Sequence, residues 1–250
     1  FNITMRDDSG DNNGNSVTAV AVAVAKKLLV SDKAQFNATM QAPTHNTPNG
    51  NMFSAARMVV SLAGPAELSD QAQFNLVMND DSSGANAAVA ARALLDATIG
   101  GAVTMSDNSR FHVTLQGGQG DITVLGKKGL ALENRAVFTL SSDNAAKGDA
   151  NVTFSGPVTL ADEAKLRILG KGNSGGSLWF HTSGTMDIGK DALVEVARSD
   201  NSGASMVAGA GRTTVNGSLR VENTSTATGG NVRFQALGGA SIAPRVPDAP

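Results

Sequence analysis

The phrase LVSDKAQFNATM, at residues 29–40, returns as ELSDQAQFNLVM at 67–78 and as TMSDNSRFHVTL at 104–115. In each copy a polar Ser-Asp pair and a small residue precede a Phe that begins a run of alternating apolar residues. Alternation with a period of two predicts a β-strand with one buried face. Asp before such a strand favours a tight turn, because its side chain tolerates left-handed backbone angles and bonds to nearby main chain. The repeated phrase therefore predicts a corner and the strand that follows it.

The corner recurs four more times in degenerate form. If each unit is anchored on the large apolar residue after its corner, the anchors are Phe36, Phe74, Phe111, Phe138, Leu166, Val194 and Val221. Phe1 fits one unit earlier. The first two intervals are the longest, and the later ones are nearly constant at 27 or 28 residues. A fixed period of this size is typical of a solenoid, in which each repeat stacks on the next.

Every unit has the same internal order: a short alternating strand, a loop rich in Gly, Asn, Asp and Ser, a second strand, and a third short strand that leads into the next corner. Three short strands per unit, without a convincing helix, predict an all-β fold, a right-handed parallel β-helix of about eight coils. At a spacing of roughly 4.8 Å per coil, the rod would be about 40 Å long. We expect Phe36, Phe74, Phe111 and Phe138 to stack inside it.

We assign residues 1–243 to this solenoid and residues 244–250 to a Pro-rich terminus or linker. Both ends stop in mid-pattern without the polar cap that solenoids need, so we expect a segment of a longer rod. Two Ala-rich stretches, 54–64 and 86–97, have a helix-forming composition. They occupy the place of the alternating VTAVAVAVA at 17–25, and we predict strands there too. A β-sandwich or a leucine-rich repeat fits less well, because neither the expected hairpins nor a helix per unit is evident.

Composition limits the possible functions. The chain is 41% hydrophobic but only 4% aromatic, with one Trp, no Tyr and 28 Gly, which suits a narrow core with many turns. A net charge of −2 gives no basis for nucleic-acid binding. No apolar run reaches membrane-spanning length, and the absence of Cys excludes disulfides and thiolate metal sites.

A search for catalytic chemistry finds little support. His45, His112 and His181 lie far apart in the repeat, so we predict no metal site, and no motif indicates a cofactor. No Gly-x-Ser-x-Gly elbow is present. Turn chemistry is the simplest explanation of the corner acids, which are Asp32, Asp70, Asp107, Asp162 and Asp191. The acidic loops lack the residue order of a calcium loop. We therefore predict no catalytic residues.

Loop position is the one functional signal. The first loop of each unit follows the same strand, and it is longest in the first three units, at 6–16, 41–52 and 79–88. Insertions on one face of a solenoid often form its binding face. The candidate binding residues are Asp7, Asp8, Asp11, Asn12, Asn13, His45, Asn46, Asn49, Asp80 and Asp81. Tolerated surface loops without a ligand remain the alternative.

The SDxAxF corners, the three-strand units, the Gly/Asn/Ser loops and the lack of Cys resemble the passenger domains of bacterial autotransporters. These are right-handed β-helical adhesins of the type V secretion pathway, and they include the antigen 43 and AIDA-like group. The resemblance covers residues 1–243 and lies in the composition and the repeat period, without a signature motif. It implies display on the outer membrane of a Gram-negative bacterium, or secretion, with membrane attachment only through a C-terminal barrel outside this sequence.

We therefore expect a non-catalytic adhesin segment. Its partner would be a host glycan, an extracellular-matrix receptor or another copy of the passenger. The alternative is a carbohydrate-active β-helix enzyme, a polysaccharide lyase or hydrolase, which would place paired carboxylates on one face.

Overall fold

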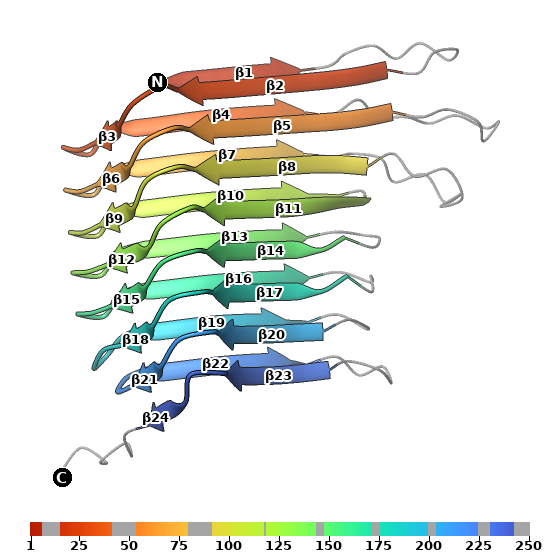
Figure 1. The fold of residues 1–250 in the computed structure, drawn as a ribbon. Helices are drawn as coiled ribbons and strands as arrows, with labels where there is room; N and C mark the ends of the chain where they lie inside the picture. The colour runs from red at the N-terminus through yellow and green to blue at the C-terminus, as the bar shows by residue number, and fades with distance from the viewer. Residues whose placement is uncertain are drawn as a thin grey trace, which may run out of the picture.

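The chain forms a right-handed parallel β-helix of eight coils, each contributing one strand to each of three parallel sheets (Figure 1). The structure is a computed structural model and describes residues 1–6, 16–41, 54–79, 92–117, 119–143, 148–171, 176–199, 204–224 and 231–242. Within those residues there are 24 strands and no helix. The first and last coils lie at opposite ends of the rod (Figure 1). The predicted fold class is confirmed.

Sheet A contains the strands that follow the corners. They are β1 (Asn2–Arg6), β4 (Gln35–Gln41), β7 (Gln73–Asn79), β10 (Arg110–Gln116), β13 (Val137–Asp143), β16 (Lys165–Lys171), β19 (Leu193–Arg198) and β22 (Ser218–Asn223). Burial alternates along β7, where the even-numbered residues are buried in the core and the odd-numbered residues face outward.

Sheet B contains the second strand of each coil. Its members are β2 (Ser16–Val24), β5 (Ser54–Leu62), β8 (Arg92–Ile99), β11 (Gln119–Gly126), β14 (Ala150–Phe154), β17 (Leu178–Thr182), β20 (Ala204–Gly209) and β23 (Asn231–Ala236). The Ala-rich stretches form strands where they are described, in β5 and β8, because their outward and inward positions alternate as the coil requires. Residues 86–91 lie outside the described chain.

Sheet C contains the three-residue strands before the corners. They are β3 (Leu28–Val30), β6 (Ala66–Leu68), β9 (Val103–Met105), β12 (Leu130–Leu132), β15 (Val158–Leu160), β18 (Met186–Ile188), β21 (Thr213–Val215) and β24 (Ala240–Ile242). In the strands from β6 to β21 both end residues are buried in the core and the middle one points outward.

In the first five coils the corner between sheets C and A is a two-residue left-handed turn, whereas in the sixth only Asp191 has a positive φ. In the first coil Asp32 and Lys33 have φ of 55° and 63°, and the amide of Ala34 donates to the carbonyl of Ser31 at 2.9 Å. Positive φ at both central residues with this bond defines a type I′ turn. The turns also bond to one another along the rod, as the amide of Lys33 donates to the carbonyl of Asp70 at 2.9 Å. The corners therefore extend the ladder of the strands.

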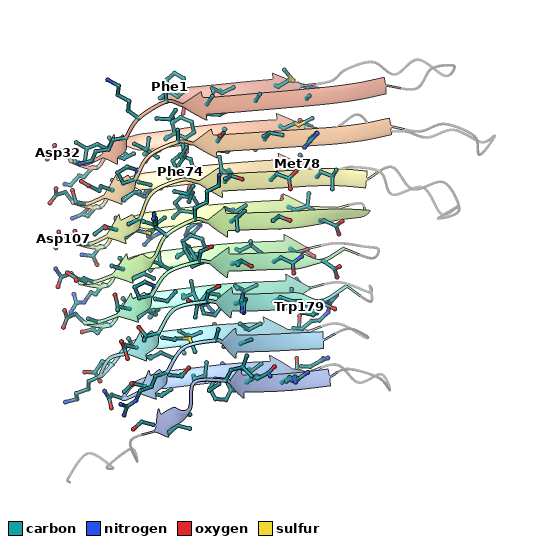
Figure 2. The ribbon with its side chains drawn as sticks, viewed as in Figure 1. Phe1, Asp32, Phe74, Met78, Asp107 and Trp179 are labelled. Carbon is teal, nitrogen blue, oxygen red and sulfur yellow. The ribbon has the colours of Figure 1, made fainter. Side chains whose placement is uncertain are left out.

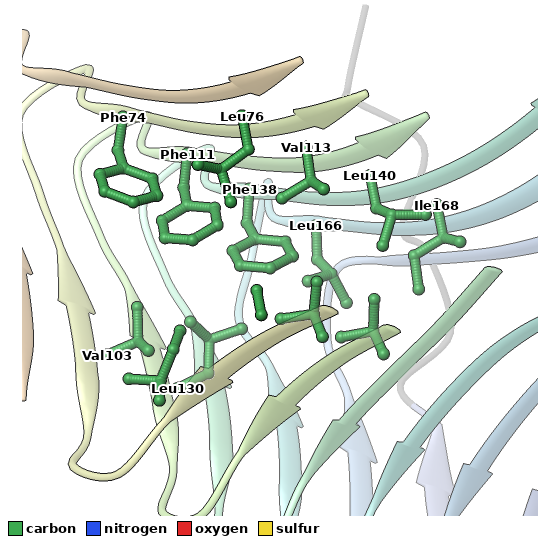
Figure 3. Packing of buried hydrophobic residues seen from close by; sticks show 14 of the residues in the cluster. Phe74, Leu76, Val103, Phe111, Val113, Leu130, Phe138, Leu140, Leu166 and Ile168 are labelled. Carbon is green, nitrogen blue, oxygen red and sulfur yellow. The ribbon is translucent and has the colours of Figure 1, made fainter. Parts of the chain in front are cut away.

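A column of phenylalanine rings fills the first half of the core. Phe1, Phe36, Phe74, Phe111 and Phe138 stack nearly parallel, with centroid distances of 5.3, 4.6, 4.7 and 4.9 Å. The rings are stacked because the strands pair in register, which places each Phe directly over the next (Figure 3). Leu166 continues the same column. The predicted stack is confirmed.

The ring of Phe154 enters the core at right angles to this column. It meets Phe138 edge-on, with centroids 6.1 Å apart and planes at 73°. The neighbour of Phe154 in the coil above is Gly126, and a β-carbon on that glycine would overlap the Phe154 ring. The missing side chain of Gly126 makes the space that this ring occupies.

The predicted anchor of the last unit is wrong by two residues. Val194 pairs with Leu219, and Val221 pairs with Val196 further along the strand. The final corner is shorter than the others, with only Asn216, Gly217 and Ser218 between strand β21 and the anchor. A side chain at Gly217 would overlap backbone atoms of the preceding corner. This tight approach allows the coil to close with two residues fewer.

The core becomes more polar toward the C-terminal coils. The inward column that contains Met40, Met78 and Leu115 continues with Ser142, Gly170 and Arg198. Arg198 is buried, and its guanidinium donates to the backbone carbonyl of Gly176. The N-terminal half of the rod therefore has the larger apolar contribution to stability.

We expect the Phe column to be a main source of stability. Phe111→Ala should lower the free energy of unfolding by about 3–5 kcal/mol, because it opens a cavity between two stacked rings. Phe111→Leu should cost less than half of this, since Leu166 already fills the same position lower in the column. Urea unfolding followed by circular dichroism measures both. Equal losses for the two variants would contradict the stacking argument.

A second prediction concerns Ser109, which occupies the small corner position held by Ala72 and Ala136 in the adjacent coils. Its hydroxyl is buried and, in the described part of the chain, has no hydrogen-bond partner. Ser109→Ala should therefore stabilise the protein by about 1–2 kcal/mol and raise Tm. Ser106→Ala is the control, because the Ser106 hydroxyl donates to Asp107 at 2.7 Å. No gain for Ser109→Ala, or an equal gain for both, would count against this explanation.

Candidate functional site

The connections from sheet A to sheet B differ greatly in length from coil to coil. Strands β10 and β11 are joined by only two residues, Gly117 and Gly118, with Gly117 at a φ of 77°. The corresponding connections in the first three coils are residues 7–15, 42–53 and 80–91. A two-residue link thus suffices to close a coil at this edge. The longer connections contain residues that closure of the coil does not require.

These three connections leave the rod from one edge. Arg6 pairs with Gln41, and Gln41 pairs with Asn79, so the last residues before them form a single row along sheet A. Sheet B resumes as a row too, since Val17 pairs with Ala55 and Ala55 with Arg92. The prediction that the long loops share one side of the rod agrees with this arrangement of their attachment points.

All ten predicted binding residues fall within the three long connections. Asp7, Asp8, Asp11, Asn12, Asn13, His45, Asn46, Asn49, Asp80 and Asp81 lie outside the described residues. The structure therefore fixes where their segments begin and end on the rod.

The corner acids are part of the turn structure. The hydroxyls of Ser69 and Ser106 donate to the carboxylates of Asp70 and Asp107 at 2.8 and 2.7 Å. Asn134 adds a bond from the next coil, from Nδ2 to Oδ1 of Asp107 at 3.1 Å. Figure 2 shows Asp32 and Asp107 at this corner edge. The interpretation of these acids as turn residues is supported by their positive φ and by these bonds.

The outer face of sheet A carries a ladder of amides. Asn37 donates from Nδ2 to Oδ1 of Asn2 at 2.7 Å, and Asn75 donates in the same way to Asn37 at 2.7 Å. Each side chain uses the one above it as acceptor, because the strands are in register. These amides therefore stabilise the sheet and have fewer hydrogen-bonding groups left for a ligand.

Further along the same outer column the ladder becomes ionic. Glu195 is 5% exposed and lies between two arginines, with Arg167 Nε at 2.7 Å and Arg220 Nη1 at 3.2 Å. Arg220 also contacts Glu222 at 2.6 Å, and its hydrogen bond to that carboxylate lowers the Glu222 pKa. The charges neutralise one another across adjacent coils, so this cluster is structural.

The described histidines do not form a site. His112 lies on the outer face of sheet A, and His181 lies on sheet B; His45 is outside the described residues. No group of three or more His, Asp or Glu side chains in the described segments is placed to hold a metal ion. Burial, followed by the positive charge of Arg110, lowers the pKa of His112.

Sequence reasoning overlooked Trp179. It lies on strand β17 between Leu178 and Phe180, which both point into the core, so its indole points outward and is 42% exposed (Figure 2). Every other aromatic residue in the described chain belongs to an inward column. Alternation along LWFHT was the signal that could have identified an outward Trp on a flat sheet.

The lowered pKa of His112 generates a prediction about pH. The unfolded chain binds a proton near pH 6.5, whereas the folded chain does so only at lower pH, so stability should fall as the pH drops from about 6.5. His112→Asn should remove this part of the loss and extend the amide ladder from Asn75. Tm measured from pH 8 to pH 5 tests it. Because His45 and His181 remain in both proteins, identical pH profiles would contradict the assignment to His112.

Comparison with known proteins does not place the chain in a family. The described segments contain no helix with the length and hydropathy needed to span a membrane. No family model, curated protein or solved structure matches the sequence or its fold.

Proposed function

We propose that the chain is a surface-displayed adhesin segment without catalytic activity. In this proposal the three long connections at one edge of the rod make the contacts, with host glycans, extracellular matrix or copies of the same protein. The observation that carries it is the contrast between the two-residue link of the fourth coil and the much longer links above it. Binding loops are typically insertions that the fold does not require and that recur at one edge of a rigid scaffold.

The chemistry of these segments favours weak, repeated contacts. Their sequences are rich in Asp, Asn, Ser and Thr, which supply hydrogen-bonding groups but few apolar anchors. Individual contacts of this kind are weak, and they gain strength when many copies act together on a surface. The parallel stacking also suits a display role, because the three described sheets have open strand edges only in the first and last coils.

The fourth coil supplies a template for the test. Asn79 pairs with Gln116 and Arg92 pairs with Gln119, so residues 80–91 can be replaced by Gly-Gly without a change of register. Equivalent replacements of 7–16 and 42–54 complete a triple variant. We expect protein-coated beads to lose most of their aggregation and of their attachment to cultured cells or matrix-coated wells. A variant with only residues 144–147 shortened, in the fifth coil, is the matched control and should behave as the parent protein.

The comparison of adhesion requires that each variant folds as the parent protein does. Far-UV circular dichroism and Tm measure this for each variant. Full aggregation and attachment by a folded triple variant would overturn the proposal. The carbohydrate-active alternative is tested on the parent protein with neutral and acidic polysaccharides. Release of new reducing or unsaturated ends would replace the adhesin proposal with an enzymatic one.

A further inference from the structure

The outer face of sheet B contains an exposed indole that has hydrogen-bonding groups on the side of strand β14. Trp179 on β17 is in register with Asn151 on β14, and Asn151 is in register with Thr123 on β11. In the next row His181 pairs with Thr153. Neighbouring strands lie about 4.8 Å apart, so these side chains project as a compact, regular array.

The polar groups around Trp179 are available to a ligand. In the described part of the chain, the side chains of Asn151, Thr123, Thr153 and His181 make no hydrogen bond or ion pair. The outer column of sheet A is different, because its amides and charges bond to one another. Donors and acceptors left unpaired beside an exposed ring distinguish this patch from the rest of the described outer surface.

The placement of Trp179 is also unusual for this chain. The other described aromatic rings lie in inward columns, and all of them except Phe1 and Phe234 in the two end coils are buried, which is favourable. An outward indole leaves much of its apolar area in water. A flat ring with a polar edge is a common contact group in binding surfaces, since it offers a large area with few rotatable bonds.

We propose that Trp179, Asn151, Thr123, Thr153 and His181 form a platform for a neutral glycan. One face of a pyranose ring carries C–H groups, whose partial positive charge is attracted to the negative face of an indole. The hydroxyls around the sugar ring then meet the amide, hydroxyl and imidazole groups of the neighbouring rows. The site is separate from the long connections of the first three coils.

The charges near the platform select against acidic ligands. Asp121 and Asp149 lie at the adjoining edge of the same sheet, where their carboxylates accept bonds from the amides of Asp149 and Ser177 at 2.8 and 2.6 Å. The outward side chains of β11, β14 and β17 include no Lys or Arg. On these three strands a sulfated, phosphorylated or carboxylated glycan would therefore meet repulsion without a compensating cation, and the arginine in the row of Trp179, Arg233 on β23, lies two strands away.

The single Trp makes the test direct, because without Tyr the intrinsic fluorescence of the chain comes from Trp179 alone. The probes are hexasaccharides of β-1,4-glucan, β-1,3-glucan, mannan and xylan, with a heparin hexasaccharide as the acidic comparison. We expect a saturable emission change with at least one neutral probe and none with heparin. By calorimetry Trp179→Ala should weaken binding at least ~10-fold and Asn151→Ala several-fold, and Trp179→Phe should keep part of it. Leu29→Ala, at an exposed apolar residue on strand β3 of sheet C, is the control and should bind as the parent protein.

Three results would overturn the platform. They are no response to any neutral probe, equal binding by Trp179→Ala, or an emission change that depends on protein concentration alone and so reports self-association at this face. The loop-shortened triple variant retains Trp179. Its fluorescence titration and its adhesion assays can therefore fail independently of each other.

Discussion

In-register hydrogen bonding between consecutive coils is the constraint on which the rest of the molecule depends. Because each strand pairs with its equivalent in the next coil, every side chain lies above a side chain from the same position of the repeat. Identical residues therefore become columns. Phenylalanines stack as rings in the core, and asparagines bond as a ladder outside. The left-handed corners keep this register between sheets, since their amides bond across coils as strands do.

The column rule explains how much could be predicted from the sequence. The repeated Phe after each SDxAx corner was sufficient to predict the coils, the sheets and the ring stack. The error at Val221 has a physical cause. Leu219 and Val221 are separated by two positions and face the same side of strand β22, so an alternating pattern cannot distinguish one from the other as the anchor. Only the short corner at Asn216 and Gly217, where a backbone approach excludes a β-carbon, determines the register.

Functional chemistry was less predictable, because function in a solenoid does not follow the repeat. The sequence indicated where long insertions occur, and the two-residue link at Gly117 shows that the coil closes without them. It did not indicate that the outer amides of Asn37 and Asn75 would satisfy each other while Asn151 would not. That difference depends on which residue occupies the same column in the neighbouring coil. The outward position of Trp179 could be predicted from the alternation along its strand. Its unpaired polar neighbours could be identified only from the pairing of β14 with β17.

The similarity of the first corners has a consequence for how the chain reaches this structure. The phrases around Asp32, Asp70 and Asp107 are so alike that the sheet A strand of one coil could pair with that of a coil two repeats away, with Phe36 over Phe111. Such a slip would satisfy the local backbone bonds and ring contacts almost as well as the native pairing, but would expel the intervening coil as a loop. The native pairing is favoured because it buries the coil that the slipped pairing would leave exposed. It is also favoured because each coil forms on a neighbour that has already folded. Degenerate corners such as those at Asn134 and Asp162 reduce this ambiguity, because the residues around them differ from one coil to the next.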